Sequence, residues 1–95
     1  MIHLSKYQAQ FELRKACVLI PTFNNASSLA AVIEDVLAFT HNIILVNDGS
    51  TDHTASILAS YPQLLVIAYP KNKGKGWALR QGFTAARKEI GRAHV

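Results

Sequence analysis

The chain lacks several features that would each assign it to a familiar class of protein. It has a single cysteine, Cys17, so no disulfide can form within it, and this fits a reducing compartment. No apolar run approaches the roughly 20 residues that cross a membrane, and residues 1–15 lack the continuous apolar core of a signal peptide. The four histidines show no metal-ligand spacing. These absences favour a cytoplasmic protein, either free or on the cytoplasmic face of a membrane.

Acidic residues are also scarce. Six Asp and Glu stand against ten Lys and Arg, which gives a net charge of +4 and a pI near 9.5. Most of the positive charge lies in one stretch, which holds Lys71, Lys73, Lys75, Arg80, Arg87 and Lys88. Such a cluster suits an anionic partner, and a nucleotide diphosphate, an anionic membrane surface and nucleic acid are all compatible with it.

The hydrophobic pattern predicts one small α/β domain. Apolar runs at 16–20, 42–46 and 64–68 have the length and composition of strands buried on both faces. Each run is followed by a helical pattern, at about 27–39, at about 51–60 and from about 75 onward. Three strand–helix units joined by right-handed crossovers predict a parallel, Rossmann-like sheet.

The most informative segment follows the second strand. Asp48 stands at the strand's end, Gly49 permits a sharp turn, and Ser50, Thr51 and Asp52 are all helix-capping residues. Ligands of open α/β sheets bind at this end of the strands. Since three other residues can cap the next helix, we expect Asp48 to face a ligand instead.

The first strand ends in a second polar loop. Pro21 is expected to close that strand because proline cannot donate to a β-ladder, and Asn25 or Ser27 is expected to cap the next helix. Phe23 has two interpretations of equal weight. It packs against the following helix as a hydrophobic staple, or it offers a flat face to a ligand such as a nucleobase.

The third loop, Lys73-Gly74-Lys75-Gly76, precedes a helix and is expected to attract an anion there. It is not a P-loop, because the glycine-to-lysine spacing is wrong and no Ser or Thr follows Lys75. Nor is it a dinucleotide fingerprint, which would follow the first strand. An exposed basic turn is the simpler alternative.

Three motifs together resemble the front of a family 2 glycosyltransferase, a GT-A-fold family that includes polyprenyl-phosphate sugar transferases. They are Pro21-Thr22-Phe23-Asn24, the segment 45–52 around Asp48, and Asn72-Lys73-Gly74-Lys75-Gly76 followed by Ala78. Their order and spacing are those of the family. One departure is Asn47, where the family often has a second aspartate.

The resemblance implies a transferase that moves a sugar from a UDP- or GDP-sugar to a polyprenyl phosphate or a saccharide, as in cell-wall or polysaccharide synthesis. It implies a nucleotide-sugar site and no role for nucleic acid, with peripheral membrane association as an option. The implied site residues are Pro21, Thr22, Phe23, Asn24, Asp48, Gly49, Lys73, Gly74 and Lys75.

The resemblance also implies parts that this sequence lacks. The family holds a divalent cation, Mg or Mn, with a D-x-D-type motif on a fourth strand, and no two acidic residues here have that spacing. We therefore expect a partial GT-A sheet that stops before the D-x-D strand, with no catalytic or metal-binding residue and no activity of its own. A non-catalytic α/β module that binds an anion is the alternative.

The expected division of the chain has three parts: a lead-in at 1–15, the nucleotide-binding front half at 16–89, and a foreign tail at 90–95. The tail reads Ile-Gly-Arg-Ala-His-Val. A widely used sequencing adapter, ATC GGA AGA GCA CAC GTC, translates to the same string. We therefore expect the tail to be adapter read-through, and resequencing the locus with independent primers tests this.

Overall fold

The computed structural model describes residues 17–89, so the expectations for residues 1–15 and 90–95 lie outside it. Strands and helices alternate along the described chain. The elements are β1 (Val18–Thr22), α2 (Ala26–Leu37), β2 (Ile43–Asp48), α3 (Thr54–Leu58), β3 (Leu65–Tyr69) and α4 (Lys75–Glu89).

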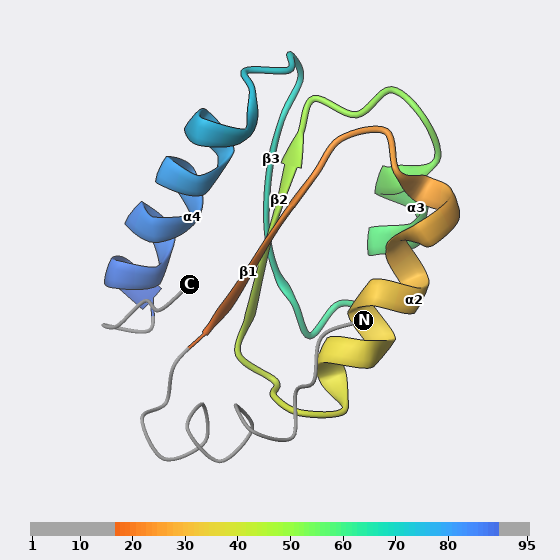
Figure 1. Ribbon diagram of the computed structural model, residues 1–95, viewed down its shortest axis with the longest axis vertical. Helices are drawn as coiled ribbons and strands as arrows, with labels where there is room; N and C mark the ends of the chain where they lie inside the picture. The colour runs from red at the N-terminus through yellow and green to blue at the C-terminus, as the bar shows by residue number, and fades with distance from the viewer. Residues whose placement is uncertain (1–16, 90–95) are drawn as a thin grey trace.

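The three strands form one parallel sheet in the order β1-β2-β3, with β2 at the centre. Helix α4 covers one face, and α2 and α3 cover the other (Figure 1). The three loops that follow the strands therefore meet at one end of the sheet. This α/β architecture with three βα units confirms the predicted fold class.

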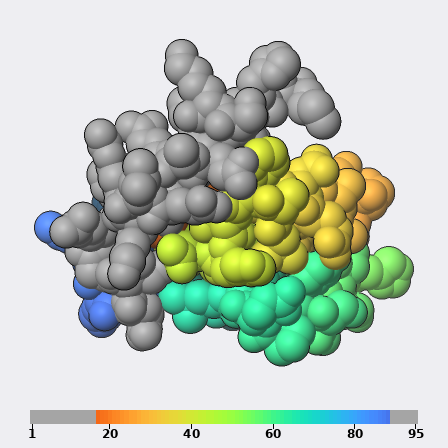
Figure 2. Space-filling model, turned by 90° about the horizontal axis from the view of Figure 1, so that it is seen from below, coloured from red at the N-terminus to blue at the C-terminus, as the bar shows by residue number. Residues whose placement is uncertain are grey.

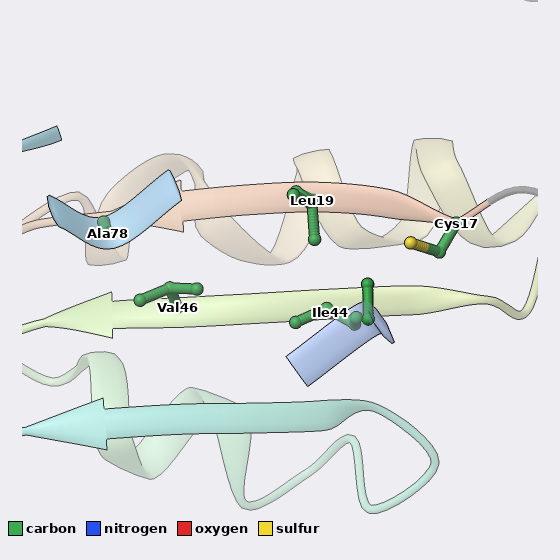
Figure 3. Packing of buried hydrophobic residues seen from close by; sticks show 6 residues of the cluster. Cys17, Leu19, Ile44, Val46 and Ala78 are labelled. Carbon is green, nitrogen blue, oxygen red and sulfur yellow. The ribbon is translucent and has the colours of Figure 1, made fainter. Parts of the chain in front are cut away.

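Two apolar cores hold the layers together, one on each face of the sheet. Side chains that alternate along β1 and β2 point to α4 and pack on its small residues (Figure 3). This first core contains Cys17, Leu19, Ile44, Val46, Ala78 and Ala86. The intervening side chains pack under α2 and α3, and this second core contains Leu29, Ile33, Ile43, Leu45, Leu58 and Leu64. The buried Cys17 is thus a core residue, as expected.

Helix α4 lies close to the sheet because Gly82 faces it. A Cβ atom at Gly82 would come within 3.2 Å of the Leu19 side chain and 3.4 Å of Val46. Within residues 17–89 no helix has both the length and the apolar character needed to span a bilayer.

Strand β1 continues through Pro21 to Thr22, so the prediction that Pro21 closes the strand is wrong. The Val18 N–H donates to Asn42 O, 2.8 Å away, on the β2 side. Because backbone groups alternate along a strand, position 21 turns its nitrogen to the outer edge. A proline is tolerated in a strand where no ladder bond is lost.

Strand β3 is less buried than its apolar sequence predicts. Val66 and Ala68 are exposed, while Leu65 and Ile67 are partly covered by the first core. Helix α3 is only five residues long and does not reach over this edge of the sheet. Within α3, Thr54 and Leu58 are buried and Ala55 is exposed.

The end of the molecule opposite the three loops is closed by packing between α2 and the segment that links α3 to β3 (Figure 2). The Tyr61 hydroxyl donates to Glu34 Oε2 there, at 2.8 Å.

Candidate functional site

A hollow of about 880 Å³ lies at the carboxyl ends of the strands. Residues from the loops after β1 and β3, together with the end of β2, form its walls. The lining residues are Leu19, Pro21, Thr22, Phe23, Asn24, Asn25, Asp48, Asn72, Gly74, Lys75 and Leu79. Most of the expected site residues are therefore brought together, but Gly49 and Lys73 are not among the lining residues.

Asp48 is the buried charge of the hollow, with only 3% of its surface exposed. Its Oδ1 accepts the Lys73 N–H at 2.8 Å, and its Oδ2 accepts the Gly74 N–H at 3.1 Å and Asn72 Nδ2 at 2.9 Å. Asn72 Nδ2 also donates to the Asp48 carbonyl, at 3.1 Å. The carboxylate thus fixes the loop between β3 and α4, a role that the sequence did not predict.

These bonds keep Asp48 ionised despite its burial. Burial alone would raise the pKa of the carboxyl, but hydrogen bonding from Lys73 N–H, the Tyr69 side chain and Gly74 N–H outweighs it, and the pKa lies below its ordinary value. A carboxylate has about four acceptor positions, and Asn72, Lys73 and Gly74 use three of them. The Tyr69 hydroxyl is a fourth donor that faces the carboxylate.

Tyr69 lies on the same side of the sheet as Asp48, to which it is paired in register. Burial and the neighbouring carboxylate raise the pKa of its phenol to about 12. The hydroxyl interacts with Asp48 electrostatically, but it reaches no partner with full hydrogen-bond geometry within the described residues. Tyr69 therefore stays protonated and presents a donor toward the carboxylate.

Thr22 carries a second buried hydroxyl in the wall of the hollow. The residue is 6% exposed, and its Oγ1 has no hydrogen-bond partner within residues 17–89. Buried polar groups in proteins are nearly always paired, so an unpaired one calls for an explanation.

Phe23 projects from the same wall with 48% of its surface exposed. A hydrophobic staple would be buried against the following helix, so the half-exposed ring speaks against that alternative. The ring lies at the rim of the hollow, where a flat ligand can reach it.

Asn24 lines the hollow with its chain bent into a positive φ of 47°. Its N–H donates to Ser50 Oγ at 3.0 Å, and its Oδ1 accepts the Thr51 N–H at 2.7 Å. The side chain therefore ties the loop after β1 to the loop after β2. Asn24 shapes the site by holding two loops together.

Asp52 extends this tie by capping two helices at once. Its Oδ2 accepts the Ala26 N–H at the start of α2, at 3.1 Å, and its Oδ1 accepts the Thr54 N–H at 3.0 Å and the Thr54 hydroxyl at 2.5 Å. Asn25 occupies the N-cap position of α2 but makes no side-chain cap bond. The expected N-cap position at Asn25 is therefore confirmed, but the capping hydrogen bond comes from Asp52 in the neighbouring loop.

Gly49 is required by the same arrangement. Its φ is +71°, and a Cβ atom here would collide with the backbone of Lys71 and Asn72. The loop between β3 and α4 packs directly on Gly49, and this contact brings Lys73 and Gly74 to the Asp48 carboxylate. The glycine permits the loop contact but does not line the hollow.

The lysine-glycine loop differs from the expected anion cradle. The N–H groups of Lys73 and Gly74 already meet an anion, which is the carboxylate of Asp48. The Lys73 ammonium lies 5.8 Å from the centre of the Trp77 ring, away from the hollow. Lys75 lines the hollow at the first turn of α4, where backbone N–H groups have no partner within the helix. The groups available to bind a phosphate are therefore the Lys75 side chain and the backbone N–H groups at this end of α4.

Sequence reasoning missed Leu19, Asn25, Asn72 and Leu79 as lining residues. The role of Asn72 was predictable, since this residue opens the third motif and its amide is a natural hydrogen-bond partner for a buried carboxylate. Leu19 and Leu79 were not, because only the packing of α4 against β1 brings them to one wall. Within residues 17–89 no group of three or more His, Cys, Asp or Glu side chains could hold a metal ion.

Comparison with known proteins decides the family. The family model described as glycosyl transferase family 2 matches residues 17–91. The chain belongs to this family. Family 2 membership accounts for the parallel sheet and for the position of the hollow at the strand ends.

Individual family 2 relatives give the same result. A dolichyl-phosphate beta-glucosyltransferase of Trichomonas vaginalis is 33% identical over 87 residues, covering 76% of this chain and 26% of the relative. The human dolichyl-phosphate beta-glucosyltransferase is 31% identical over 93 residues, covering 80% and 29%. An uncharacterized glycosyltransferase of Rickettsia typhi is 40% identical over 68 residues, covering 68% and 21%. The chain thus spans about a quarter of the length of these relatives. No solved structure matches it.

Proposed function

We propose that this chain is the donor-binding front half of the GT-A domain of a glycosyltransferase that uses a UDP- or GDP-sugar. The observation that carries the proposal is Asp48, a buried and ionised carboxylate that lines a hollow in a family 2 chain. A ligand with an N–H or O–H group, such as a nucleobase or a ribose, can donate to such a carboxylate.

The rest of the hollow suits the parts of a nucleotide. Phe23 offers an exposed ring on which a base can stack. Lys75, at the amino end of α4, offers positive charge and free backbone N–H groups to a diphosphate. Gly49, Asn24 and Lys73 serve the proposed site indirectly: the first two shape the loops, and the third gives its N–H to Asp48.

The named relatives favour one type of transfer. Two of them are dolichyl-phosphate beta-glucosyltransferases, so we propose a glucose residue and a polyprenyl-phosphate acceptor ahead of a saccharide acceptor. In this proposal, the role of residues 17–89 in the reaction is to bind the donor. The acceptor site, the catalytic base and the choice of stereochemistry belong to parts of the whole enzyme beyond these residues.

A divalent cation, Mg or Mn, is proposed for the whole enzyme as the counterion of the donor diphosphate. The described residues do not fit such an ion, because they include no cluster of metal-ligating side chains. The chain alone is accordingly proposed to bind donor without transferring sugar.

Calorimetric titration with UDP, GDP and ATP tests the proposal. We expect UDP or GDP to bind at least tenfold more tightly than the other two nucleotides, because a single hydrogen bond between a base and a charged group is worth about 1.5–3 kcal/mol. ATP, with more negative charge, serves as the control for binding by charge alone. If affinity simply follows charge, the chain is an anion-binding module and the proposal is wrong.

A further inference from the structure

The loop before α4 and the outer side of that helix carry a cluster of basic side chains. Between residues 71 and 88 the sequence has six basic residues and no acidic one. All six are exposed: Lys71, Lys73, Lys75, Arg80, Arg87 and Lys88. The acidic side chains that the structure describes lie on α2, at the end of β2 and in the loop before α3. This basic surface therefore faces away from the sheet, on the side that α4 covers (Figure 1).

Two large aromatic side chains of the same helix are exposed to solvent. Trp77 is 43% exposed and Phe83 is 38% exposed. Neither lines the hollow, so the donor site does not account for them. Exposed large aromatics among lysines and arginines are a combination that marks interaction surfaces.

We propose that this basic surface docks on an anionic lipid membrane. Indole side chains prefer the interface between water and lipid, where the ring is partly buried and the N–H stays wet. Lys and Arg beside them are attracted to anionic headgroups. The six positive charges and the absence of negative ones between residues 71 and 88 supply the complementarity that such a surface requires.

Nucleic acid fits the same surface less well. A base would have to stack on the Trp77 ring, and the Lys73 ammonium already lies over that ring, 5.8 Å from its centre. Insertion among headgroups leaves that cation–π contact in place. The geometry thus favours a lipid surface.

Docking of this kind would bring the hollow close to the membrane. The loop that carries Lys71 and Lys73 continues directly into Gly74 and Lys75, which line the hollow. Membrane docking does not depend on donor binding, and it can be measured without any nucleotide.

The sequence supplies its own reporter, because Trp77 is its only tryptophan. The 95-residue chain is mixed with vesicles of phosphatidylcholine alone or with added phosphatidylserine. With the anionic vesicles we expect a blue shift of Trp77 emission, quenching by brominated lipids, and at least tenfold tighter binding than with the neutral vesicles. Raising the salt concentration should release the protein.

Paired variants separate local charge from net charge. The double variant Arg80→Gln/Arg87→Gln should weaken vesicle binding by about tenfold or more, since each basic side chain near the surface contributes several-fold. The control Ser27→Glu/Ser28→Glu lowers the net charge equally, but at exposed positions of α2 on the other face of the sheet. It should weaken binding much less. Far-UV circular dichroism confirms that both are folded.

Three results would overturn the proposal. The first is a folded chain whose Trp77 emission does not respond to anionic vesicles. The second is an equal loss of binding in the two double variants. The third is tighter binding to a single-stranded oligonucleotide than to anionic vesicles at the same salt concentration, which would assign the surface to nucleic acid instead.

Discussion

At the scale of single residues, the site depends on a few side chains whose surroundings decide their roles. Asp48, Phe23 and Thr22 all stand at strand ends, where the sequence placed them. Their burial and partners differ: the carboxylate is buried and bonded to a loop, the ring is half exposed, and the hydroxyl is buried with no partner among residues 17–89. Each difference gives a distinct experimental expectation.

Phe23→Leu should weaken donor binding and leave stability unchanged. The substitution keeps an apolar side chain but removes the flat ring, and base stacking is worth about 1–3 kcal/mol. Because Phe23 is half exposed, little buried contact is lost. Titration with the preferred nucleotide and a thermal melt measure the two effects. A lower melting temperature with unchanged affinity would show that the ring is structural.

Thr22→Val should raise the stability of the free protein by about 1 kcal/mol. It removes a buried hydroxyl that has no partner within the described residues, and an unsatisfied polar group costs about 1–3 kcal/mol. Donor affinity should fall, because we expect the bound nucleotide to satisfy this hydroxyl. Denaturant unfolding and nucleotide titration give the two numbers. If stability drops, the hydroxyl has a partner in the free protein, and the expectation fails.

Gly49→Ala should destabilise the protein by about 2 kcal/mol or more. The left-handed conformation costs a side chain about 1–2 kcal/mol, and the added Cβ atom would also displace the backbone of Lys71 and Asn72. The matched control is Gly76→Ala, since that position lies in α4 with open space around it. Its stability should be unchanged or higher by up to about 1 kcal/mol. Equal effects in the two variants would contradict the tight contact at Gly49.

At the scale of the elements, Asp52 couples the starts of α2 and α3. The Thr54 hydroxyl is the main cause that lowers the pKa of Asp52, and the Ala26 and Thr54 N–H groups add to it against the effect of burial. A carboxyl whose pKa is lowered on folding stabilises the protein above its ordinary pKa of 3.8, and this contribution is lost as the pH falls through that value toward the folded pKa.

Asp52→Ala should therefore lower stability at neutral pH and flatten the loss of stability below about pH 4. Chemical unfolding at a series of pH values measures both effects. Asp35→Ala removes the same charge from an exposed position of α2 and should do neither. Asp48 also has a lowered pKa, so a smaller acid-dependent loss should persist in Asp52→Ala. A pH profile identical to that of the unsubstituted chain would show that the shared cap contributes nothing.

At the scale of the whole molecule, the open edges of the sheet matter most. Within residues 17–89, β1 pairs only with β2, so its outer edge has no neighbouring strand. Pro21 lies on that edge and blocks one ladder position, a protection that the predicted strand, which ended at residue 20, lacked. Val18, Leu19 and Ile20 of the same strand are apolar and suited to pairing with another chain.

We therefore expect the purified 95-residue chain to self-associate and to melt over a broad temperature range. A domain of this size buries a modest share of its surface, so an uncovered strand edge costs it a large part of its stability. Size-exclusion chromatography with light scattering and a thermal melt test this. A monomer with a sharp transition would contradict it and would favour a self-sufficient binding module.

The sequence by itself determined the elements, their order and the end of the sheet that carries the site. Period and composition are local properties, and parallel strands joined by helices place their carboxyl ends together. The short motifs around Asp48 and Phe23 further indicated family 2, and the family match confirmed it.

Only the tertiary structure decided which groups meet. Asp48 accepts bonds from residues 24 to 26 positions away, and Asp52 caps a helix that begins 26 residues earlier. The outward nitrogen of Pro21 and the exposure of β3 depend on which strand lies beside each of them. No periodicity or propensity encodes such contacts, because they arise from the packing of loops that are distant in the chain.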